Sequence, residues 1–118
     1  MKYCCYDDAP FNAVAPGAEN KMLHSERMSL VTWRFAKGYQ GASHSHPQEQ
    51  ITYVLKGKVE FTTPGGKVTA KAGEQVVFAG NEPHGSLALE DSLLVDIFSS
   101  VREDFKEKFP AVALTDIA

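Results

Sequence analysis

The chain has 118 residues, the size of one domain with a core that needs no disulfide to stabilise it. With 12 basic and 15 acidic residues its net charge is −3; no Lys or Arg run predicts a nucleic-acid or anionic-membrane partner, and no segment reaches the ~20 apolar residues of a membrane span. Because the first ten residues lack an apolar signal region, we expect a cytoplasmic protein. The adjacent Cys4 and Cys5 are expected to be reduced thiols without a structural role.

Turn residues and short apolar runs divide the chain into an N-terminal arm and a β-rich domain. Residues 1–24 have little hydrophobic period and contain Pro10, Pro16 and Gly17, which predicts an extended arm with one strand packed over the domain or over a partner subunit. Residues 25–118 are predicted to form a single all-β domain, since short strands at this spacing are typical of a sandwich or barrel. One short helix is expected over 102–109, ended by Pro110. The predicted strands cover residues 28–37, 43–46, 51–55, 58–63, 67–70, 75–78, 85–89 and 92–98.

Several predicted strands are apolar on both faces. In the strand over 92–98, Leu93, Val95 and Ile97 share one face, while Leu94 and Phe98 share the other. A sheet with one solvated face would alternate apolar and polar residues more cleanly. We therefore expect a second layer over one face, either the N-terminal arm or another subunit, and predict a homodimer.

Three histidines and an amide form the pattern most informative about function. His44 and His46 are two residues apart, so they share a face of an extended segment; Gln50 follows four residues later, and His84 lies far downstream. Neighbouring neutral imidazoles can serve as a pair of ligands for a divalent metal. The pair therefore indicates a metal site, to which the spaced glycines around it and the third His add weight.

These residues resemble the two motifs of the cupin family. The first motif is matched by Gly38, His44, His46 and a closing Gly57, with Gln50 where the motif has Glu. The second is matched by Gly73 and His84, whereas three turn and framing positions differ: Ala79 replaces Pro, Asn81 replaces Gly and Ala88 replaces Asn. The resemblance implies an all-β fold, a small cupin jelly-roll β-barrel (a double-stranded β-helix of two sheets) with a metal at its mouth and one short C-terminal helix.

A narrower resemblance is to the pectin-degradation cupins of the KdgF type, which linearise 4,5-unsaturated uronate monosaccharides to 5-keto-4-deoxyuronate. It rests on the run from His44 to Gln50, on His84, and on the spacing Asp96-x-Phe98-x3-Arg102. The resemblance implies a small carbohydrate acid as substrate and catalytic roles for Asp96, Phe98 and Arg102. It also implies one divalent transition metal held by three His and a Gln. By position these ligands are His44, His46, Gln50 and His84.

Several alternatives stay open at this stage. Glu49 competes with Gln50 as fourth ligand, although even spacing from His46 favours Gln50. Asp96, a carboxylate within an apolar strand, either lines a wet cavity or forms a structural ion pair with Arg102, and Arg102 could instead cap the start of the helix. Trp33 and Phe35 share one strand face and serve either as core or as a wall of the pocket, and His24 is expected at the surface.

The resemblance leaves the metal and the activity open. Three imidazoles and an amide oxygen suit Zn, Ni, Fe, Mn or Co. A neutral amide in place of Glu leaves the ion more positive, which favours Lewis-acid chemistry on an anionic sugar. The alternatives are another small cupin metalloenzyme, a dioxygenase or isomerase, and a non-catalytic cupin that binds a sugar or a metal.

Overall fold

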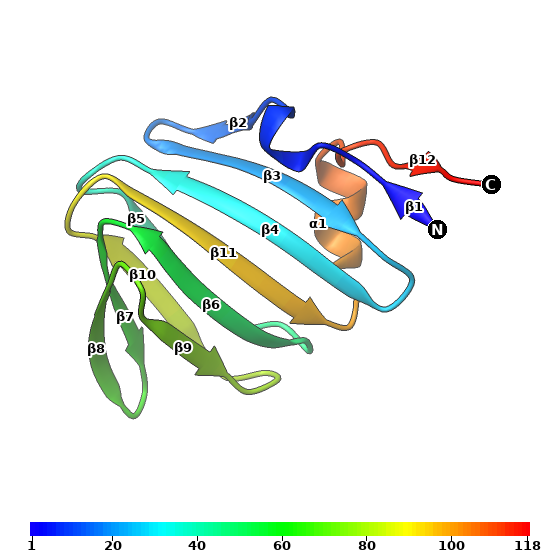
Figure 1. The fold of residues 1–118 in the computed structure, drawn as a ribbon. Helices are drawn as coiled ribbons and strands as arrows, with labels where there is room; N and C mark the ends of the chain where they lie inside the picture. The colour runs from blue at the N-terminus through cyan, green and yellow to red at the C-terminus, as the bar shows by residue number, and fades with distance from the viewer.

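The structure is a computed structural model that describes residues 1–118 and consists of two main antiparallel sheets, a two-stranded ribbon and one short helix (Figure 1). The six-stranded sheet has the order β2-β3-β4-β11-β6-β9 and the four-stranded sheet the order β5-β10-β7-β8. None of the helices has the length and apolar character that a membrane crossing requires. The elements are β1 (Lys2–Tyr3), η1 (Tyr6–Asp8), β2 (Asn12–Ala15), β3 (Ala18–His24), β4 (Met28–Phe35), β5 (Gln40–His44), β6 (Glu49–Lys56), β7 (Lys58–Thr63), β8 (Gly66–Lys71), β9 (Gln75–Phe78), β10 (His84–Ala88), β11 (Ser92–Ser99), α1 (Glu103–Lys108) and β12 (Thr115–Asp116).

The predicted all-β jelly roll with one short C-terminal helix is confirmed. All eight strands predicted after residue 25 are present, with ends that differ by up to three residues, and the helix lies within the predicted range. The two sheets pack against each other through side chains, and no continuous strand ladder closes them into a barrel. Their open edges leave space for a cavity between them.

The N-terminal segment contributes more to the fold than the predicted arm with a single strand. Both β2 and β3 belong to the six-stranded sheet, and β3 pairs with β4 at seven positions, from Ala18 to His24. The sequence of β3 lacks a clear hydrophobic alternation, because the strand buries the polar Asn20 and Lys21 beside Met22. The ends of the chain meet in the β1–β12 ribbon at one end of the molecule (Figure 1).

Two apolar clusters fill the interior, and polar side chains lie between them. The larger cluster joins the two sheets through residues such as Val54, Phe61 and Leu94, and the smaller one, formed by Met22, Val31 and Phe98, packs against Phe105 of α1 and Phe109 just beyond it. On the inner face of β11, Asp96 falls between a member of each cluster, Leu94 and Phe98. The fold therefore places buried polar groups at the junction of two cores.

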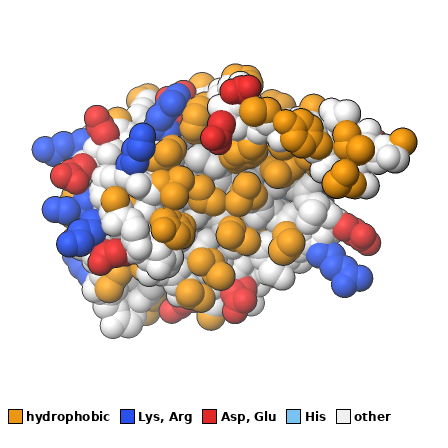
Figure 2. Space-filling view, viewed as in Figure 1, with side chains coloured by type: hydrophobic (Ala, Val, Ile, Leu, Met, Phe, Trp, Pro, Cys, Tyr) orange, Lys and Arg blue, Asp and Glu red, His pale blue; other side chains and the backbone are white.

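The outer face of the six-stranded sheet is apolar and exposed. Figure 2 shows orange side chains gathered over the middle of this sheet. Ile51, Tyr53 and Leu55 of β6, Val77 of β9 and Ile97 of β11 are each more than two-fifths exposed. The apolar character that the sequence shows on both faces of these strands is therefore real. The N-terminal segment covers this face only over β3 and β4, where Tyr6 bonds to Lys21 and Thr32, and it leaves the apolar residues of β6, β9 and β11 exposed.

Candidate metal centre and adjoining cavity

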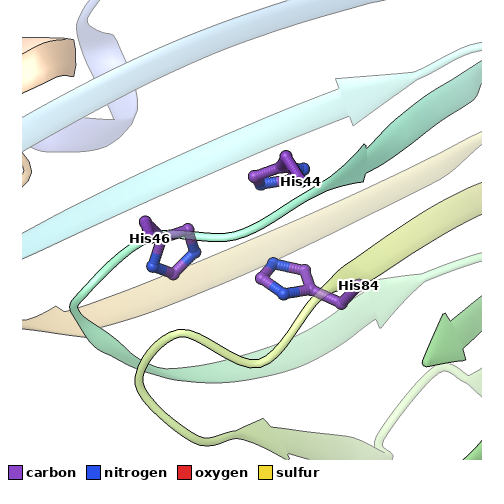
Figure 3. Close-up of side chains that lie close together, drawn as sticks. All are labelled: His44, His46 and His84. Carbon is purple, nitrogen blue, oxygen red and sulfur yellow. The ribbon is translucent and has the colours of Figure 1, made fainter. Parts of the chain in front are cut away.

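The three predicted histidines converge on one point (Figure 3). His44 ends β5, His46 follows it in the loop before β6, and His84 opens β10, directly opposite His44 in the strand register. One ring nitrogen from each lies within 4.8 Å of the others. Residues about 40 positions apart in the sequence thus form a cluster that could hold a metal ion.

The loop before His84 is anchored to the loop that carries His46. The Asn81 amide donates to the His46 carbonyl at 2.7 Å, and a side chain on Gly80 would bring its Cβ to 2.5 Å from the Pro47 carbonyl. Asn81 has a positive φ of 65°, a conformation that Asn tolerates better than most residues. The departure from Gly at this motif position therefore leaves the turn intact, and His84 is held beside His46.

The hydrogen bonds of the three rings leave the same nitrogen free on each. Every ring places Nδ1 within hydrogen-bond distance of a backbone carbonyl, which accepts the Nδ1 proton and leaves Nε2 with a lone pair. For His84 this Nε2 is buried and has no partner in the protein. The carbonyls are those of Ala42, Gln48 and Glu82, at 3.0, 3.0 and 2.8 Å from His44, His46 and His84 respectively.

Gln50 places a potential fourth ligand atom beside the histidines. Its side chain is buried on the inner face of β6, whereas Glu49 is exposed, so the position of Gln50 agrees with the even spacing from His46. Its Oε1 lies 3.1 Å from His46 Nε2. With Nδ1 carrying the ring proton, both atoms are acceptors, and two ligand atoms each about 2.1 Å from one ion come about 3 Å apart. The residues present therefore fit a divalent cation.

Burial keeps two of the three histidines, His46 and His84, neutral. It lowers the pKa of His46 to about 4, with further lowering from the positive charge of Arg102 and from His84. It also lowers the pKa of His84, against an opposing hydrogen bond to the Glu82 carbonyl. Neutral rings can bind a cation at neutral pH without first losing a proton.

A cavity of about 270 Å³ adjoins the histidines, and Asp96, Phe98 and Arg102 all line it. Asp96 is only 6% exposed, and its Oδ1 accepts a hydrogen bond from Thr52 Oγ1 at 2.5 Å. Burial raises the pKa of Asp96 to about 6, although the Thr52 hydrogen bond and the charge of Arg102 act in the opposite direction. The carboxyl group is thus half protonated about one pH unit below neutrality, and roughly a tenth of it still carries the proton at pH 7.

Arg102 is paired with Asp104 and makes no salt bridge to Asp96. Its Nε and Nη2 donate to the two carboxylate oxygens of Asp104 at 3.0 and 2.7 Å, and Nη1 has no protein partner. The guanidinium lies 4.7 Å from the ring centre of Phe98 and 3.8 Å from that of Phe105. The alternatives of an Asp96–Arg102 ion pair and of a side-chain helix cap are therefore not observed.

Some residues of the site were not found from the sequence. Phe78 stacks on His84 with ring centres 4.3 Å apart, and Thr52 joins Gln50 to Asp96 through its hydroxyl. The parity of β6 could have identified Thr52, since it shares a face with Gln50. Trp33 and Phe35 serve in both of the roles considered, because they pack on the core and also line the cavity.

The expectation that His24 lies at the surface is wrong, because this residue is half-buried. Its Nδ1 lies 2.7 Å from the buried Ser29 hydroxyl, and that hydroxyl accepts a hydrogen bond from the Arg102 backbone amide.

The jelly roll and its cluster of three histidines define a cupin. The sequence pattern of the cupin domain matches residues 31–98, more than half of the chain, and the chain belongs to this family. It is 36% identical over 107 residues to the pectin degradation protein KdgF of Dickeya dadantii (strain 3937), a match that covers 88% of this chain and 97% of that protein. This similarity places the chain among the KdgF-type cupins, as the motifs indicated.

Solved structures give the same relationship. The structure of KdgF from Halomonas sp. is 34% identical, with a TM-score of 0.79 over 84% of this chain and 94% of that one. An RmlC-like cupin from Shewanella frigidimarina NCIMB 400 is 26% identical, with a TM-score of 0.81 over 87% of this chain and 94% of that one.

Proposed function

We propose that this protein is a metal-dependent cupin that converts 4,5-unsaturated uronate monosaccharides to linear 5-keto-4-deoxyuronate in the breakdown of pectin or alginate. The observation that carries the proposal is the position of three imidazole Nε2 lone pairs and an amide oxygen at the edge of a cavity that is also lined by Asp96 and Arg102. The similarity to a pectin degradation protein over almost its full length supports the substrate class. The conversion is an isomerisation and needs no oxidant.

His44, His46, His84 and Gln50 would hold one divalent ion, Zn, Ni, Fe, Mn or Co. When bound, the ion supplies Lewis acidity that polarises a substrate oxygen. The protein itself fixes the direction of the three imidazoles through the backbone carbonyls behind the rings.

Asp96 has the chemistry of the general acid and base that the reaction requires. Ring opening removes the proton of the anomeric hydroxyl and breaks the bond between C1 and the ring oxygen, which leaves an aldehyde at C1 and an enolate at C5; ketonisation then adds a proton to C4 and converts the enolate into the C5 ketone. A carboxyl group with a pKa of about 6 can take up the first proton and deliver the second near neutral pH. Its near-complete burial fixes its position relative to a substrate in the cavity.

Arg102 would bind the substrate carboxylate, and Phe98 would support that contact. A second anion can approach Arg102 through the free Nη1, because Asp104 occupies only the edge formed by Nε and Nη2. Phe98 is 1% exposed; its ring contacts His46 edge-on at 5.4 Å between centres and lies next to the guanidinium. It therefore contributes the apolar wall that joins the metal end of the cavity to the carboxylate end.

The test is conversion of a purified 4,5-unsaturated galacturonate or mannuronate-derived monosaccharide, followed by the loss of its enol-ether absorbance and by the product's NMR spectrum. We expect the metal-loaded protein to accelerate the reaction over the protein-free rate. The Asp96→Asn variant should retain metal and fold and lose ~10²–10⁴-fold in kcat. A wild-type protein that binds metal without accelerating the conversion, or an Asp96→Asn variant with normal turnover, would contradict the assignment.

We also propose that the apolar outer face of the six-stranded sheet meets a second copy of the chain. A groove of about 1020 Å³, larger than the site cavity, runs along this face beneath the N-terminal segment and includes none of the histidines. The charges of its lining side chains balance: Asp7, Glu19 and Asp91 are acidic, and Lys21, Arg34 and Lys56 are basic. A two-fold contact brings a patch against itself, so an apolar face with both signs of charge beside it is self-complementary. Sedimentation analysis should therefore give a dimer, and a monomer at high concentration would contradict it.

A further inference from the structure

Thr52 is a buried polar residue to which the proposed reaction assigns no contact with substrate. It lies in the middle of β6 with no exposed surface, on the inner face between Gln50 and Val54, and it is directly opposite Asp96 in the register with β11. Its hydroxyl contacts both neighbours: Gln50 Nε2 donates to Thr52 Oγ1 at 2.8 Å, and Thr52 Oγ1 donates to Asp96 Oδ1 at 2.5 Å.

When Asp96 is ionised, the hydroxyl can make these two bonds in one direction only. It has a single proton, which goes to the Asp96 carboxylate, since a carboxylate only accepts. Its lone pair is then left to accept from Gln50, which must present its NH₂ group to Thr52. The two ends of an amide have nearly the same shape, so packing alone does not distinguish the two orientations of Gln50.

This constraint determines which atom of Gln50 faces the histidines. With the NH₂ group held by Thr52, Oε1 points at His46 Nε2, 3.1 Å away. A flipped amide would turn its NH₂ group, which cannot bind a cation, toward the same place. Thr52 Oγ1 is the acceptor at 2.8 Å from the Gln50 NH₂ group, and the Asp96 carboxylate, whose pKa burial raises and the Gln50 amide lowers, favours the same orientation.

We propose that Thr52 is a positioning residue that holds Gln50 with its carbonyl oxygen toward the three histidines and so makes Gln50 a metal ligand. The proposal rests on the metal site of the proposed function and is independent of the substrate and the reaction. Thr52 acts through Gln50, which means that its effect on metal binding should vanish when the Gln50 amide is absent.

The experiment compares Co²⁺ affinity and the visible Co²⁺ spectrum of the full-length metal-free protein and its variants at mildly alkaline pH. Thr52→Val keeps the shape of the side chain and removes the hydroxyl; we expect Co²⁺ affinity to fall ~10–100-fold, with a changed spectrum. Thr52→Ser restores the hydroxyl and should bind within about threefold of wild type, since a hydroxyl bond is what matters. Thr32→Val is a matched control in the same sheet, where the hydroxyl bonds to Tyr6, far from the histidines, and should leave Co²⁺ binding unchanged.

A double-mutant cycle completes the test. In a Gln50→Ala background, Thr52→Val should cause no further loss of affinity. Equal affinity of wild type and Thr52→Val, an additive loss in the Gln50→Ala background, or failure of Thr52→Ser to restore binding would overturn the proposal. If Thr52→Val does not fold, as judged by circular dichroism, Thr52→Ala with the same expected loss decides. A wild-type protein that binds no Co²⁺ would contradict the metal site itself, whereas metal binding without uronate conversion would contradict only the proposed reaction.

Discussion

The two faces of strands β6 and β11 differ in a way that reverses the usual distribution of side chains. On the inner face, Thr52 is opposite Asp96, and both are buried. On the outer face, Ile51 is opposite Ile97 and Tyr53 is opposite Val95, and the two isoleucines and the tyrosine are each over 40% exposed. At this level of the two strands, between the apolar Leu94 and Phe98 of the inner face, polar groups thus lie inside and apolar groups outside.

This reversal indicates two places at which the protein could bind a partner. A buried polar group without a full set of partners is costly, and a broad exposed apolar face marks an interaction surface. On the inner face the partner that we propose is a cation with its substrate, and on the outer face it is a second copy of the chain. The variants below separate the two faces, in order of decreasing expected effect.

Removal of one inner-face imidazole should have the largest effect. His84→Ala deletes a buried ligand whose Nε2 has no other partner, so we expect metal affinity to fall by more than the ~10–100-fold typical of residues behind the ligands. Competition with a chromophoric chelator measures it. His24→Ala is the control, because His24 lies outside the cluster, and it should keep its metal. Stoichiometric metal in His84→Ala with native affinity would contradict the inner-face account.

Neutralising the inner carboxyl group should stabilise the metal-free protein. A carboxyl whose pKa rises from 3.8 to about 6 on folding destabilises the fold by on the order of 3 kcal/mol once both states are ionised. The cost is absent below the unfolded pKa, grows as the pH rises from about 4 to about 6, and is complete above that range.

Denaturant unfolding of Asp96→Asn in EDTA should therefore show a gain over wild type at neutral pH that disappears toward pH 4. A gain that does not change with pH, or a loss at neutral pH, would show that Asp96 is not a strained, desolvated carboxylate.

A charge on the outer face should change assembly and leave the site intact. Ile97→Glu places a carboxylate on the apolar face. We expect the dissociation constant of the dimer to rise ~10-fold or more, since burying an unpaired charge costs several kcal/mol. Light scattering after size exclusion measures the mass. Val68→Glu is the matched control, because Val68 is also exposed, at 52% against 42% for Ile97, but belongs to the other sheet. Metal content and turnover per subunit should stay native in both; loss of metal from Ile97→Glu would show that the two faces are not independent.

The smallest effect is expected at Asp104, the salt-bridge partner of Arg102. Asp104 is 60% exposed, whereas its partner Arg102 is only 4% exposed, and Asn keeps an oxygen that can accept from the guanidinium. We therefore expect Asp104→Asn to raise KM for the uronate by no more than about fivefold with kcat unchanged. Steady-state kinetics on the purified monosaccharide check this. A large fall in kcat would instead give Asp104 a part in proton transfer.

The parts of this picture that follow local rules could be predicted from the sequence. Two-residue spacing placed His44 with His46 and chose Gln50 over Glu49, and turn residues set the ends of most strands. The features that could not be predicted from the sequence depend on contacts between distant segments. β3 was hidden because Lys21 is buried against the backbone carbonyls of the N-terminal segment, and neither the Asp104 partner of Arg102 nor the Thr52 link between Gln50 and Asp96 has a signature in sequence spacing.

The central claim is that His44, His46, His84 and Gln50 converge on one cation. Anomalous diffraction from a crystal grown with Zn²⁺ or Co²⁺ tests it most directly. We predict one strong peak about 2.0–2.2 Å from the three Nε2 atoms and from Gln50 Oε1, with each Nδ1 still bonded to its backbone carbonyl. A crystal whose anomalous peaks all lie elsewhere, or one in which Gln50 turns its amide away from the ion, would contradict it.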